Sequence, residues 1–347
     1  MPPISRRLLR MGVLGTAKIA RQWIRDLQDC GAVQIVAVAS RSDAAAQAFA
    51  QKYSLPRWHG SYEALLVDPD VDAVYIPLPN SLHATWAIAA ARQGKHVLCE
   101  KPLALGKEEA EVMFAAARDN GVVLLEAYPW WFQPQTRDLL ALLQGGVIGD
   151  VRTVQASFGF VLSNGAGNIR MNPDLGGGAL LDAGSYTLSM IRLVMGEAPL
   201  SVVAHATYAD TGVDISLMAT LLYADGRRAQ LSCAMDVANH RRATITGTAG
   251  TIETEYLNHT SDGPGHPWGY LPSELRVRRG TANSIPFEPV YSATGSGFRF
   301  GAEAFAQLVA TGDTAAVARA AQASIDIAAT LEAIAQSARE GRAIALR

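Results

Sequence analysis

The chain has 347 residues, 49% of them hydrophobic, and this length and composition predict about two folded domains. A formal net charge of −2 and a pI near 6.4 leave no basic excess for a nucleic acid backbone, so we expect no nucleic acid partner. No apolar run approaches the roughly eighteen residues that a membrane span needs, so we expect no membrane insertion.

The cysteines, two arginines and the histidines bear on location and on metal binding. Cys30, Cys99 and Cys233 are an odd number at wide spacings, which fits neither a disulfide framework nor a zinc site and indicates a reducing compartment. Arg6 and Arg7 form a twin-arginine pair, but the apolar run after them is too short for an export signal. We therefore expect a cytoplasmic protein. The seven histidines show no ligand spacing on one element, so we expect no metal.

The chain begins with the pattern of a nucleotide-binding unit. Residues 8–14 have the pattern of a buried strand, and apolar residues recur at helical spacing from Ile19 onward. Between them, Gly15-x-Ala17-x-x-Ala20 is a loosened dinucleotide fingerprint, in which small residues make the tight turn and let the backbone approach a pyrophosphate. The helix start would offer N–H groups to the phosphates. The alternative is that Gly15 serves only the backbone of an ordinary turn.

The end of the second expected strand, residues 34–39, favours NADP over NAD. Enzymes that use NAD place an acid about 20 residues beyond the glycine turn, where it binds a ribose hydroxyl. Here Ser40 and Arg41 follow the strand instead. A hydroxyl and a guanidinium suit a ribose 2′-phosphate, because a guanidinium binds anions through planar, bidentate contacts. The alternative is that Arg41 is a solvated residue capping the entry to the helix begun by Asp43.

A further loop falls on the same carboxyl edge of the expected sheet, where open α/β sheets bind ligands. The expected strand at residues 73–76 gives way to a loop that contains Pro79, Asn80, Ser81 and His83. The alternative is that Asn80 and Ser81 cap the next helix and that His83 is an ordinary residue of its first turn.

The next expected strand ends in Glu100-Lys101-Pro102. Strands of a parallel sheet are buried on both faces, so charges occur only where a strand ends. Glu100 and Lys101 are therefore candidates for a pair that faces the cofactor or the substrate. The alternative, that Lys101 begins a solvated loop, is equally compatible with this stretch alone.

The rhythm of strands and helices predicts a doubly wound parallel sheet up to Tyr128, where an aromatic segment breaks it. We place the domain boundary there, with a dinucleotide-binding Rossmann domain at residues 1–128 and a substrate-binding and oligomerisation α/β domain at residues 129–347. Beyond the boundary, strand-like runs separated by turn signals predict a mostly antiparallel sheet. These runs lie at residues 151–160, 200–208, 215–223, 228–235 and 243–246, with helices at 303–308 and 318–338.

One segment of the second domain differs from plain scaffold. Three glycines, residues 176–178, precede Asp182 and Tyr186, which are four residues apart and would share a helix face. A carboxylate and a phenol beside a glycine-rich turn can hold and deprotonate an alcohol. The alternative is a capping aspartate with a half-buried tyrosine one turn later, and only a cofactor site in the first domain favours the functional interpretation.

Taken together, these motifs carry a resemblance. Residues 15–20, Pro79-Asn80-x-x-His83, Glu100-Lys101-Pro102, and the glycines at 176–178 with Asp182-x-x-x-Tyr186 resemble the glucose-fructose oxidoreductase and inositol dehydrogenase (Gfo/Idh/MocA) family. Within it, the chain is most similar to the branch of NADP-dependent xylose dehydrogenases and dihydrodiol dehydrogenases. The resemblance implies a Rossmann domain followed by a domain with an open-faced, mostly antiparallel sheet, through which we expect a homodimer or homotetramer.

The resemblance also implies roles for single residues. Lys101 and Tyr186 would flank the reacting carbon, Asp182 would support them as the third catalytic residue, and Lys101-Pro102 would be a cis bond. The expected cofactor residues are Gly15, Thr16, Ala17, Lys18, Ile19, Ser40, Arg41, Pro79, Asn80, His83, Glu100 and Lys101. The expected substrate residues are Lys101, Trp131, Arg170, Asp182 and Tyr186.

Two departures from the family pattern stand out. Ala17 replaces the usual second glycine, and Trp130-Trp131-Phe132-Gln133 stands where relatives often have Tyr-Arg-Phe-His. The second change removes a cation and an imidazole from the rim of the expected pocket, and it favours a less polar or more stacked ligand, because sugars and rings both pack on indole faces.

The expected function is hydride transfer between NAD(P), with NADP(H) favoured, and a hydroxyl or keto carbon of a sugar, polyol or cyclic diol. Tyr186 or Lys101 would accept the hydroxyl proton while the other polarises the oxygen. Two alternatives come from other classes: a non-catalytic sensor or co-regulator that binds NADP, and a glycosidase of the same fold that uses NAD transiently. Such sensors usually lose the lysine or the tyrosine, and Arg41 in place of an acid argues against the glycosidase.

Overall fold

The computed structural model describes residues 8–163, 165, 167–263 and 270–346, so Arg6 and Arg7 lie outside the described residues. By its internal contacts the chain divides into two units. The first runs to Ala104 and adds Glu108–Pro129 and Ser296–Gln322; the second holds Leu105–Lys107, Trp130–Gly295 and the chain from Ala323 onward. We expected one boundary after residue 128. Residues 296–322 differ from that expectation because the helix they contain packs on the first unit.

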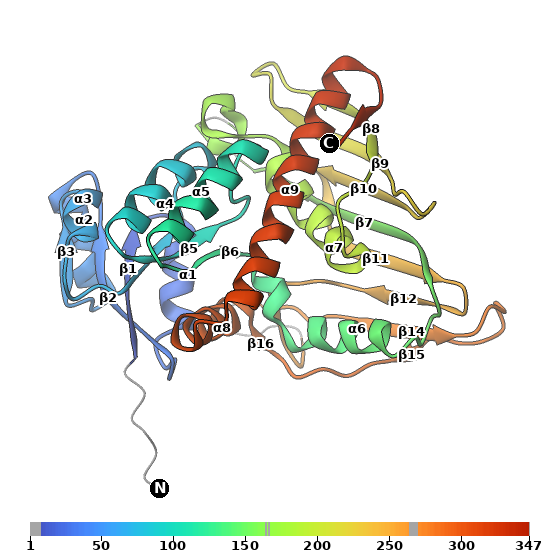
Figure 1. The fold of residues 1–347 in the computed structure, drawn as a ribbon, viewed down its shortest axis with the longest axis horizontal. Coiled ribbons are helices and arrows are strands. Elements are labelled where there is room, and N and C mark those ends of the chain that lie inside the picture. The colour runs from blue at the N-terminus through green and yellow to red at the C-terminus, as the bar shows by residue number, and fades with distance from the viewer. Residues whose placement is uncertain (1–7, 164, 166, 264–269, 347) are drawn as a thin grey trace, which may run out of the picture. The chain divides into compact units, whose positions relative to one another are not determined.

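The first unit is a six-stranded sheet in the order β3-β2-β1-β4-β5-β6, with every pairing parallel (Figure 1). The strands are β1 (Leu9–Leu14), β2 (Val33–Ala39), β3 (Arg57–His59), β4 (Ala73–Ile76), β5 (His96–Glu100) and β6 (Leu124–Ala127). The helices are α1 (Lys18–Asp26), α2 (Asp43–Lys52), α3 (Tyr62–Leu66), α4 (His83–Arg92), α5 (Lys107–Asp119) and α8 (Gly297–Thr311). The doubly wound parallel sheet is therefore confirmed.

The position of the candidate site follows from the strand order. The chain moves outward from β1 to β2 and β3, then returns to the other side of β1 with β4. Loops that leave the carboxyl ends of strands on either side of such a reversal diverge, and ligands of open α/β sheets bind in that crevice. The turns after β1, β2, β4 and β5 all lie on this edge.

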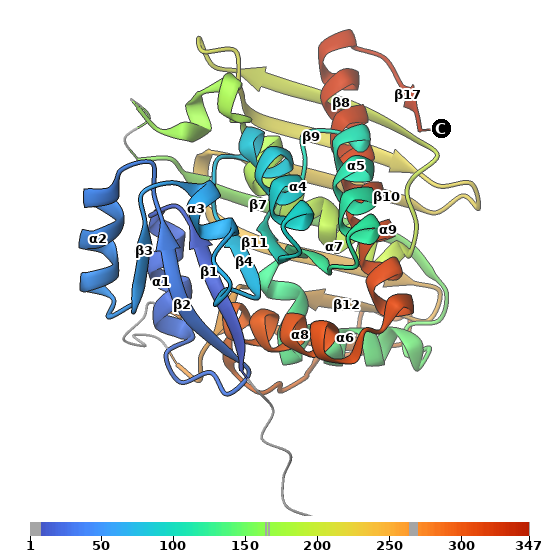
Figure 2. The same cartoon turned by 60° about the vertical axis from the view of Figure 1, so that its left-hand side comes forward.

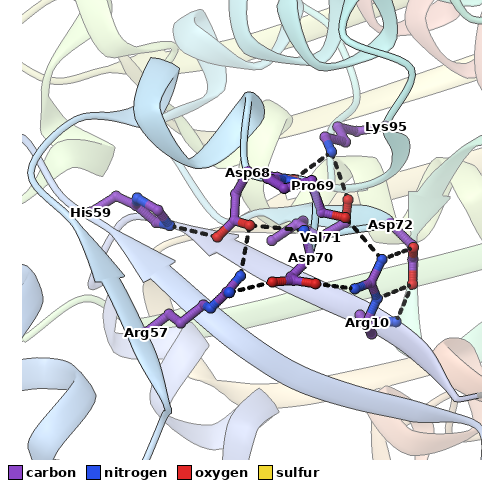
Figure 3. A network of polar contacts seen from close by, with 9 residues as sticks. All are labelled: Arg10, Arg57, His59, Asp68, Pro69, Asp70, Val71, Asp72 and Lys95. Atoms are coloured by element: carbon purple, nitrogen blue, oxygen red, sulfur yellow. Dashed lines mark hydrogen bonds and ion pairs between the residues drawn. The ribbon is translucent and has the colours of Figure 1, made fainter.

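Figure 3 shows a polar network on the loop that joins α3 to β4, at the opposite, amino end of the strand. Lys95 Nζ donates to the carbonyl oxygens of Asp68 and Val71, both at 2.7 Å. Arg10 of β1 donates to the carboxylates of Asp70 and Asp72. Arg57 and His59 of β3 bind the carboxylate of Asp68. The network ties three strands together away from the carboxyl edge.

The second unit contains a nine-stranded sheet in the order β15-β14-β12-β11-β7-β10-β9-β8-β17. Its strands are β7 (Val151–Val161), β8 (Ser201–Tyr208), β9 (Asp214–Leu222), β10 (Arg228–Ala234), β11 (Asp236–Gly247), β12 (Gly250–Thr254), β14 (Leu275–Arg279), β15 (Glu288–Pro289) and β17 (Ile344–Ala345). Among the described strands of this sheet, β7 and β10 pair in parallel and the other neighbours pair antiparallel, so the mostly antiparallel sheet is confirmed.

One face of this sheet carries helices and the other face is open. The helices α6 (Pro134–Gln144) and α7 (Ser185–Met195) and the last part of α9 (Thr314–Glu340) belong to the unit (Figure 2). Along β9 the side chains of Leu217, Ala219 and Leu221 are buried, whereas Met218 between them is 66% exposed. Alternation of this kind is expected for a sheet that is covered on one side. Within the described residues, every helix falls short of the length or apolarity needed to traverse a bilayer.

Candidate active site

The turn after β1 leaves the start of α1 without a side-chain cap. Gly15 has φ of 102°, and its N–H donates to the Ala39 carbonyl at 2.8 Å. Ala17 precedes α1 and makes no capping hydrogen bond, and the first turn of α1 contains no acid. N–H groups and a positive dipole at a helix start attract anions. The residues expected from the sequence, Gly15, Thr16, Ala17, Lys18 and Ile19, thus fit the pyrophosphate of a dinucleotide.

Ser40 and Arg41 follow β2 on the same edge. The capping residue of α2 is Ser42, whose hydroxyl accepts a hydrogen bond from the Ala45 N–H at 3.4 Å, so Arg41 is not the cap. Arg41 is exposed and has no hydrogen-bond or ion-pair partner among the described residues. An exposed guanidinium next to a hydroxyl fits a 2′-phosphate.

The loop after β4 contains Pro79 and Asn80 and leads into α4, whose first residue is His83. No side chain caps the short 3₁₀ turn at Asn80–Leu82 or the start of α4, so capping does not account for Asn80. His83 is fully buried, and its ring nitrogens each lie 2.9 Å from a backbone carbonyl oxygen, of Pro102 and of Leu78. Burial lowers the pKa of His83, and the carbonyls oppose this shift only in part. His83 therefore holds the loop after β4 against the loop after β5.

The loop after β5 is held from three sides. Glu100 is buried and accepts hydrogen bonds from the Tyr75 hydroxyl at 2.6 Å and from the Lys101 N–H at 3.3 Å. Glu126 on β6 accepts the Leu103 N–H at 2.8 Å. The Lys101-Pro102 peptide bond is cis, as the resemblance implied. The backbone that presents Lys101 is thus fixed by β4, by α4 and by β6, which is the preorganisation that a catalytic side chain requires.

In the second unit, the glycines at 176–178 make room for two neighbours. A Cβ atom on Gly177 would lie 2.5 Å from the Arg170 carbonyl oxygen, and one on Gly178 would lie 2.2 Å from Asp214 Oδ1. Asp214 also accepts the Leu180 N–H at 2.6 Å, at the start of a π-helical turn, Leu180–Gly184. Burial raises the pKa of Asp214, although these backbone hydrogen bonds oppose the shift. Asp214 therefore sets the start of the turn that carries Asp182.

Asp182 lies in this π-helical turn, and Tyr186 follows in the first turn of α7. π-helical turns occur frequently at functional sites. Arg170 Nε donates to Asp182 Oδ2 at 2.5 Å. Against the effect of burial, Asp182 and, more weakly, Tyr186 act to raise the pKa of the Arg170 guanidinium, so Tyr186 lies near it. Three of the expected substrate residues, Arg170, Asp182 and Tyr186, thus lie together in the second unit.

Trp131 is the fourth expected substrate residue of this unit. It lies edge-on to Trp130, with the ring centres 6.3 Å apart. Trp130 itself is fully buried and donates from its indole N–H to the Ser189 hydroxyl at 3.0 Å. Of the two indoles, Trp131 is therefore the one with exposed surface for stacking. Lys101, the remaining expected substrate residue, belongs to the first unit.

Comparison with known proteins supports the same assignment. Residues 9–128 match the family described as "Oxidoreductase family, NAD-binding Rossmann fold", and residues 136–253 match the "GFO/IDH/MocA C-terminal domain". The chain is 36% identical to D-xylose 1-dehydrogenase (NADP(+)) 2 of Haloferax volcanii over 338 residues, which cover 97% of this chain and all of that protein. The chain belongs to the Gfo/Idh/MocA family of oxidoreductases. It is an NAD(P)-dependent enzyme of the branch to which the sequence motifs pointed.

Other relatives agree in length and fold. Trans-1,2-dihydrobenzene-1,2-diol dehydrogenase of Danio rerio is 35% identical over 88% of this chain and 89% of its own. The aldose-aldose oxidoreductase of Caulobacter crescentus, solved with glycerol, superposes with a TM-score of 0.85 at 29% identity over 98% of this chain and all of its own. A 3-ketoreductase of Actinomadura kijaniata, solved with NADP and TDP-benzene, gives a TM-score of 0.84 at 31% identity over 95% and 98%.

The structure also shows site residues that the sequence analysis missed. They are Tyr75, Glu126, Asp214, Arg241 and Asn258. Arg241 had a usable signal, because alternation backward from Ala243 and Ile245, both buried, places it on the covered face of β11. A charged residue on a buried face is a candidate for function. Asp214 and Asn258 had no such signal, since their partners are 34 and 72 residues away along the chain.

Proposed function

We propose that this enzyme transfers a hydride between NADP(H) and a hydroxyl or keto carbon of a sugar, polyol or cyclic diol. The observation that carries the proposal is the fixed loop after β5, which presents Lys101 at the carboxyl edge of a nucleotide-binding sheet. The substrate class is inferred from the names of the relatives, which act on xylose and on a dihydrodiol.

The bound cofactor supplies C4 of its nicotinamide as hydride acceptor or donor. The start of α1 would hold its pyrophosphate, and Ser40 and Arg41 its 2′-phosphate, while Pro79, Asn80 and Glu100 would line the nicotinamide region. His83, being enclosed between two carbonyls, would act by holding the loops on which those residues lie.

Lys101 and Tyr186 would handle the proton of the substrate hydroxyl as one coupled group. In oxidation the carbon gives its hydride to the cofactor, the hydroxyl gives its proton to the pair, and a carbonyl remains. Asp182, paired with Arg170, would orient the substrate near Tyr186, and Trp131 would offer a ring for stacking.

We infer the oligomeric state from the exposed apolar side chains of the sheet, and the cytoplasmic location from the cysteines. The open face of the nine-stranded sheet carries Val203, Met218 and Leu222, each at least 39% exposed, and supports a homodimer or homotetramer through this face. The three cysteines are free thiols and are buried, which fits a reducing compartment such as the cytoplasm.

A substrate screen tests the proposed function. Sugars, polyols and cyclic diols would be offered with NADP⁺ and their keto forms with NADPH, and the NADPH absorbance would be followed. We expect stoichiometric NADPH formation or consumption with at least one of them. Cleavage of a glycoside without net NADPH formation would instead identify the glycosidase, and binding of NADPH without turnover of any compound would identify a sensor.

A further inference from the structure

The hydroxyl of Tyr186 accepts a hydrogen bond whose direction is fixed by chemistry. Asn258 Nδ2 donates to Tyr186 Oη at 3.0 Å, and Asn258 Oδ1 accepts from Arg241 Nη1, also at 3.0 Å. A guanidinium has only donors, so the reversed amide would set its N–H groups against those of Arg241. The side chain of Asn258 therefore presents a donor to the phenol oxygen.

Arg241 brings a positive charge to the same place. Its guanidinium carbon lies 4.0 Å from the ring centre of Phe158 and 4.4 Å from that of Tyr186. Its Nε is buried and makes no hydrogen bond among the described residues, and the Asp182 carboxylate, which is paired with Arg170, acts on the Arg241 charge. Burial lowers the pKa of Arg241. Aromatic faces stabilise a cation only in part, so a negative charge nearby would be favoured.

Of the two phenols beside Arg241, Tyr186 is the one whose oxygen receives a hydrogen bond, so it is better suited than Tyr256 to carry negative charge next to Arg241. The Tyr256 hydroxyl donates to the Ser157 carbonyl oxygen at 3.1 Å, which requires its proton. Burial raises the pKa of Tyr256 well above its usual value. Tyr186 instead receives a hydrogen bond at its oxygen, and hydrogen bonds to the charged form of a group favour that form.

The backbone of Asn258 is fixed by Gln133, so its amide is placed before any substrate binds. Gln133 Nε2 donates to the Asn258 carbonyl oxygen at 2.5 Å and to that of Gly295 at 3.2 Å. Gln133 Oε1 in turn accepts from the Thr260 hydroxyl at 3.4 Å. Gln133 is one of the residues that depart from the family pattern, and here it positions Asn258.

We propose that Arg241 and Asn258 are positioning residues that stabilise the deprotonated hydroxyl of Tyr186. The inference rests on the proposed function, in which Tyr186 acts on the substrate hydroxyl. In oxidation, the substrate O–H bond would break and its proton pass to the phenolate oxygen, while the hydride of the hydroxyl-bearing carbon would pass to the oxidised cofactor and a carbonyl would remain. In the reverse direction Tyr186 gives its proton to the oxygen of the keto substrate, and the negative charge that develops on the phenol oxygen meets a donor and a cation already in place, which lowers the barrier.

The change Asn258→Asp tests this directly. It keeps the shape and the contact with Arg241 but replaces the donor to Tyr186 by an acceptor. With the substrate found by the screen, we expect kcat to fall about 10²–10³-fold with KM little changed, as for loss of an oxyanion donor. The acid limb of the pH profile of kcat should move to higher pH. This shift can be assigned to the lost donor, because the variant keeps the other groups that face Tyr186, namely Arg170, Asp182, Arg241 and Tyr256. The control Asn283→Asp makes the same charge change at an exposed turn.

A second measurement needs neither substrate nor cofactor. Tyrosinate absorbance is titrated with pH, and subtraction of the Tyr186→Phe titration isolates Tyr186. We expect its ionisation at lower pH in the unchanged protein than in Asn258→Asp or Arg241→Met, with Arg241→Lys between them. Arg278→Met is the matched control, because Arg278 also lies over an aromatic ring, 4.3 Å from the centre of Phe287, but does not contact Tyr186.

The outcomes separate this inference from the function on which it rests. If Tyr186→Phe loses turnover while Asn258→Asp and Arg241→Met keep it and leave the titration unmoved, the inference is overturned and the proposed function stands. If Tyr186→Phe keeps full turnover, the inference and the catalytic role of Tyr186 both fail, while hydride transfer itself stands. If Asn258→Asp lowers kcat equally in the Tyr186→Phe background, Asn258 has a structural role only, since a residue that acts through Tyr186 has no further effect there.

Discussion

At the scale of single residues, we propose that Arg41 determines the choice between NADP and NAD. Changing Arg41 to Ala should weaken NADP binding by about 1.5–3 kcal/mol, or about ten- to hundredfold, because a charge-assisted contact to the 2′-phosphate is lost. NAD affinity should hardly change. Titration calorimetry with both cofactors measures this.

The control for this prediction is Lys52→Ala, which removes an exposed cation at the other end of α2. Equal weakening of NADP binding in both variants would mean that Arg41 contributes only to the general surface potential.

Residues that act through their own chemical type could be predicted from the sequence, whereas residues that act through a distant partner could not. Lys101 and Arg41 follow strand ends, and a strand end can be located from hydrophobic pattern alone. His83 was expected to line the cofactor site, but its role as a link between two loops depends on carbonyls 5 and 19 residues away. Its burial follows from packing of α4, which no local pattern reveals.

At the scale of elements, the loop between α3 and β4 contributes stability rather than catalysis. Burial opposes ionisation of Asp68, but the Asp70 N–H, His59 and Arg57 together lower its pKa. A carboxyl with a lowered pKa adds stability above its unfolded pKa of about 3.9 and loses it as the pH falls through the folded value. Asp68 should therefore stabilise the fold at neutral pH and not in strong acid.

The variant Asp68→Asn tests this. We expect it to lower the free energy of unfolding at pH 7 by about 1–3 kcal/mol, because buried hydrogen bonds to a charged group are weakened, and to lower it less at pH 3. Urea unfolding at both pH values measures the difference, with Asp119→Asn on the exposed end of α5 as the control. A loss that does not depend on pH would show that the charge of Asp68 is not responsible.

Most elements were predicted within a few residues, and the exceptions have a physical reason. The expected strand at 73–76 coincides with β4, and the one at 151–160 matches β7 to within one residue. By contrast β11 begins seven residues before the expected start at residue 243. Its first four residues are exposed, so strand pairing with β7, and not burial of an apolar face, forms this part. The strands β12 and β14 were missed because tertiary pairing decided them.

At the scale of the whole molecule, the fold class could be predicted because hydrophobic periods distinguish a parallel sheet from an antiparallel one. The return of residues 296–322 to the first unit could not be predicted from the sequence, because α8 has an apolar face that either unit could bury. Its contacts with α1, β2 and β6 determine where it belongs. Contacts of this range are absent from any local window of sequence.

The open sheet face leads to a prediction about assembly. Met218→Asp should convert the proposed oligomer to a monomer while NADPH binding is kept, since an unpaired carboxylate is costly inside an interface. Sedimentation velocity measures the molecular mass. The control Tyr291→Asp places the same charge at a residue that is 90% exposed and outside the sheet. An unchanged mass in Met218→Asp would place the interface elsewhere or leave the protein monomeric.

The proposed mechanism of hydride transfer depends most on Lys101 and Tyr186 acting together on the substrate proton. The most direct measurement is kcat for Lys101→Met, Tyr186→Phe and the double variant, with NADPH binding measured in each. We predict that each single change lowers kcat about 10²–10⁴-fold, as expected for loss of an acid or base, with NADPH still bound, and that the double variant is no slower than the slower single one. Full turnover in either single variant, or effects that multiply in the double variant, would contradict the account.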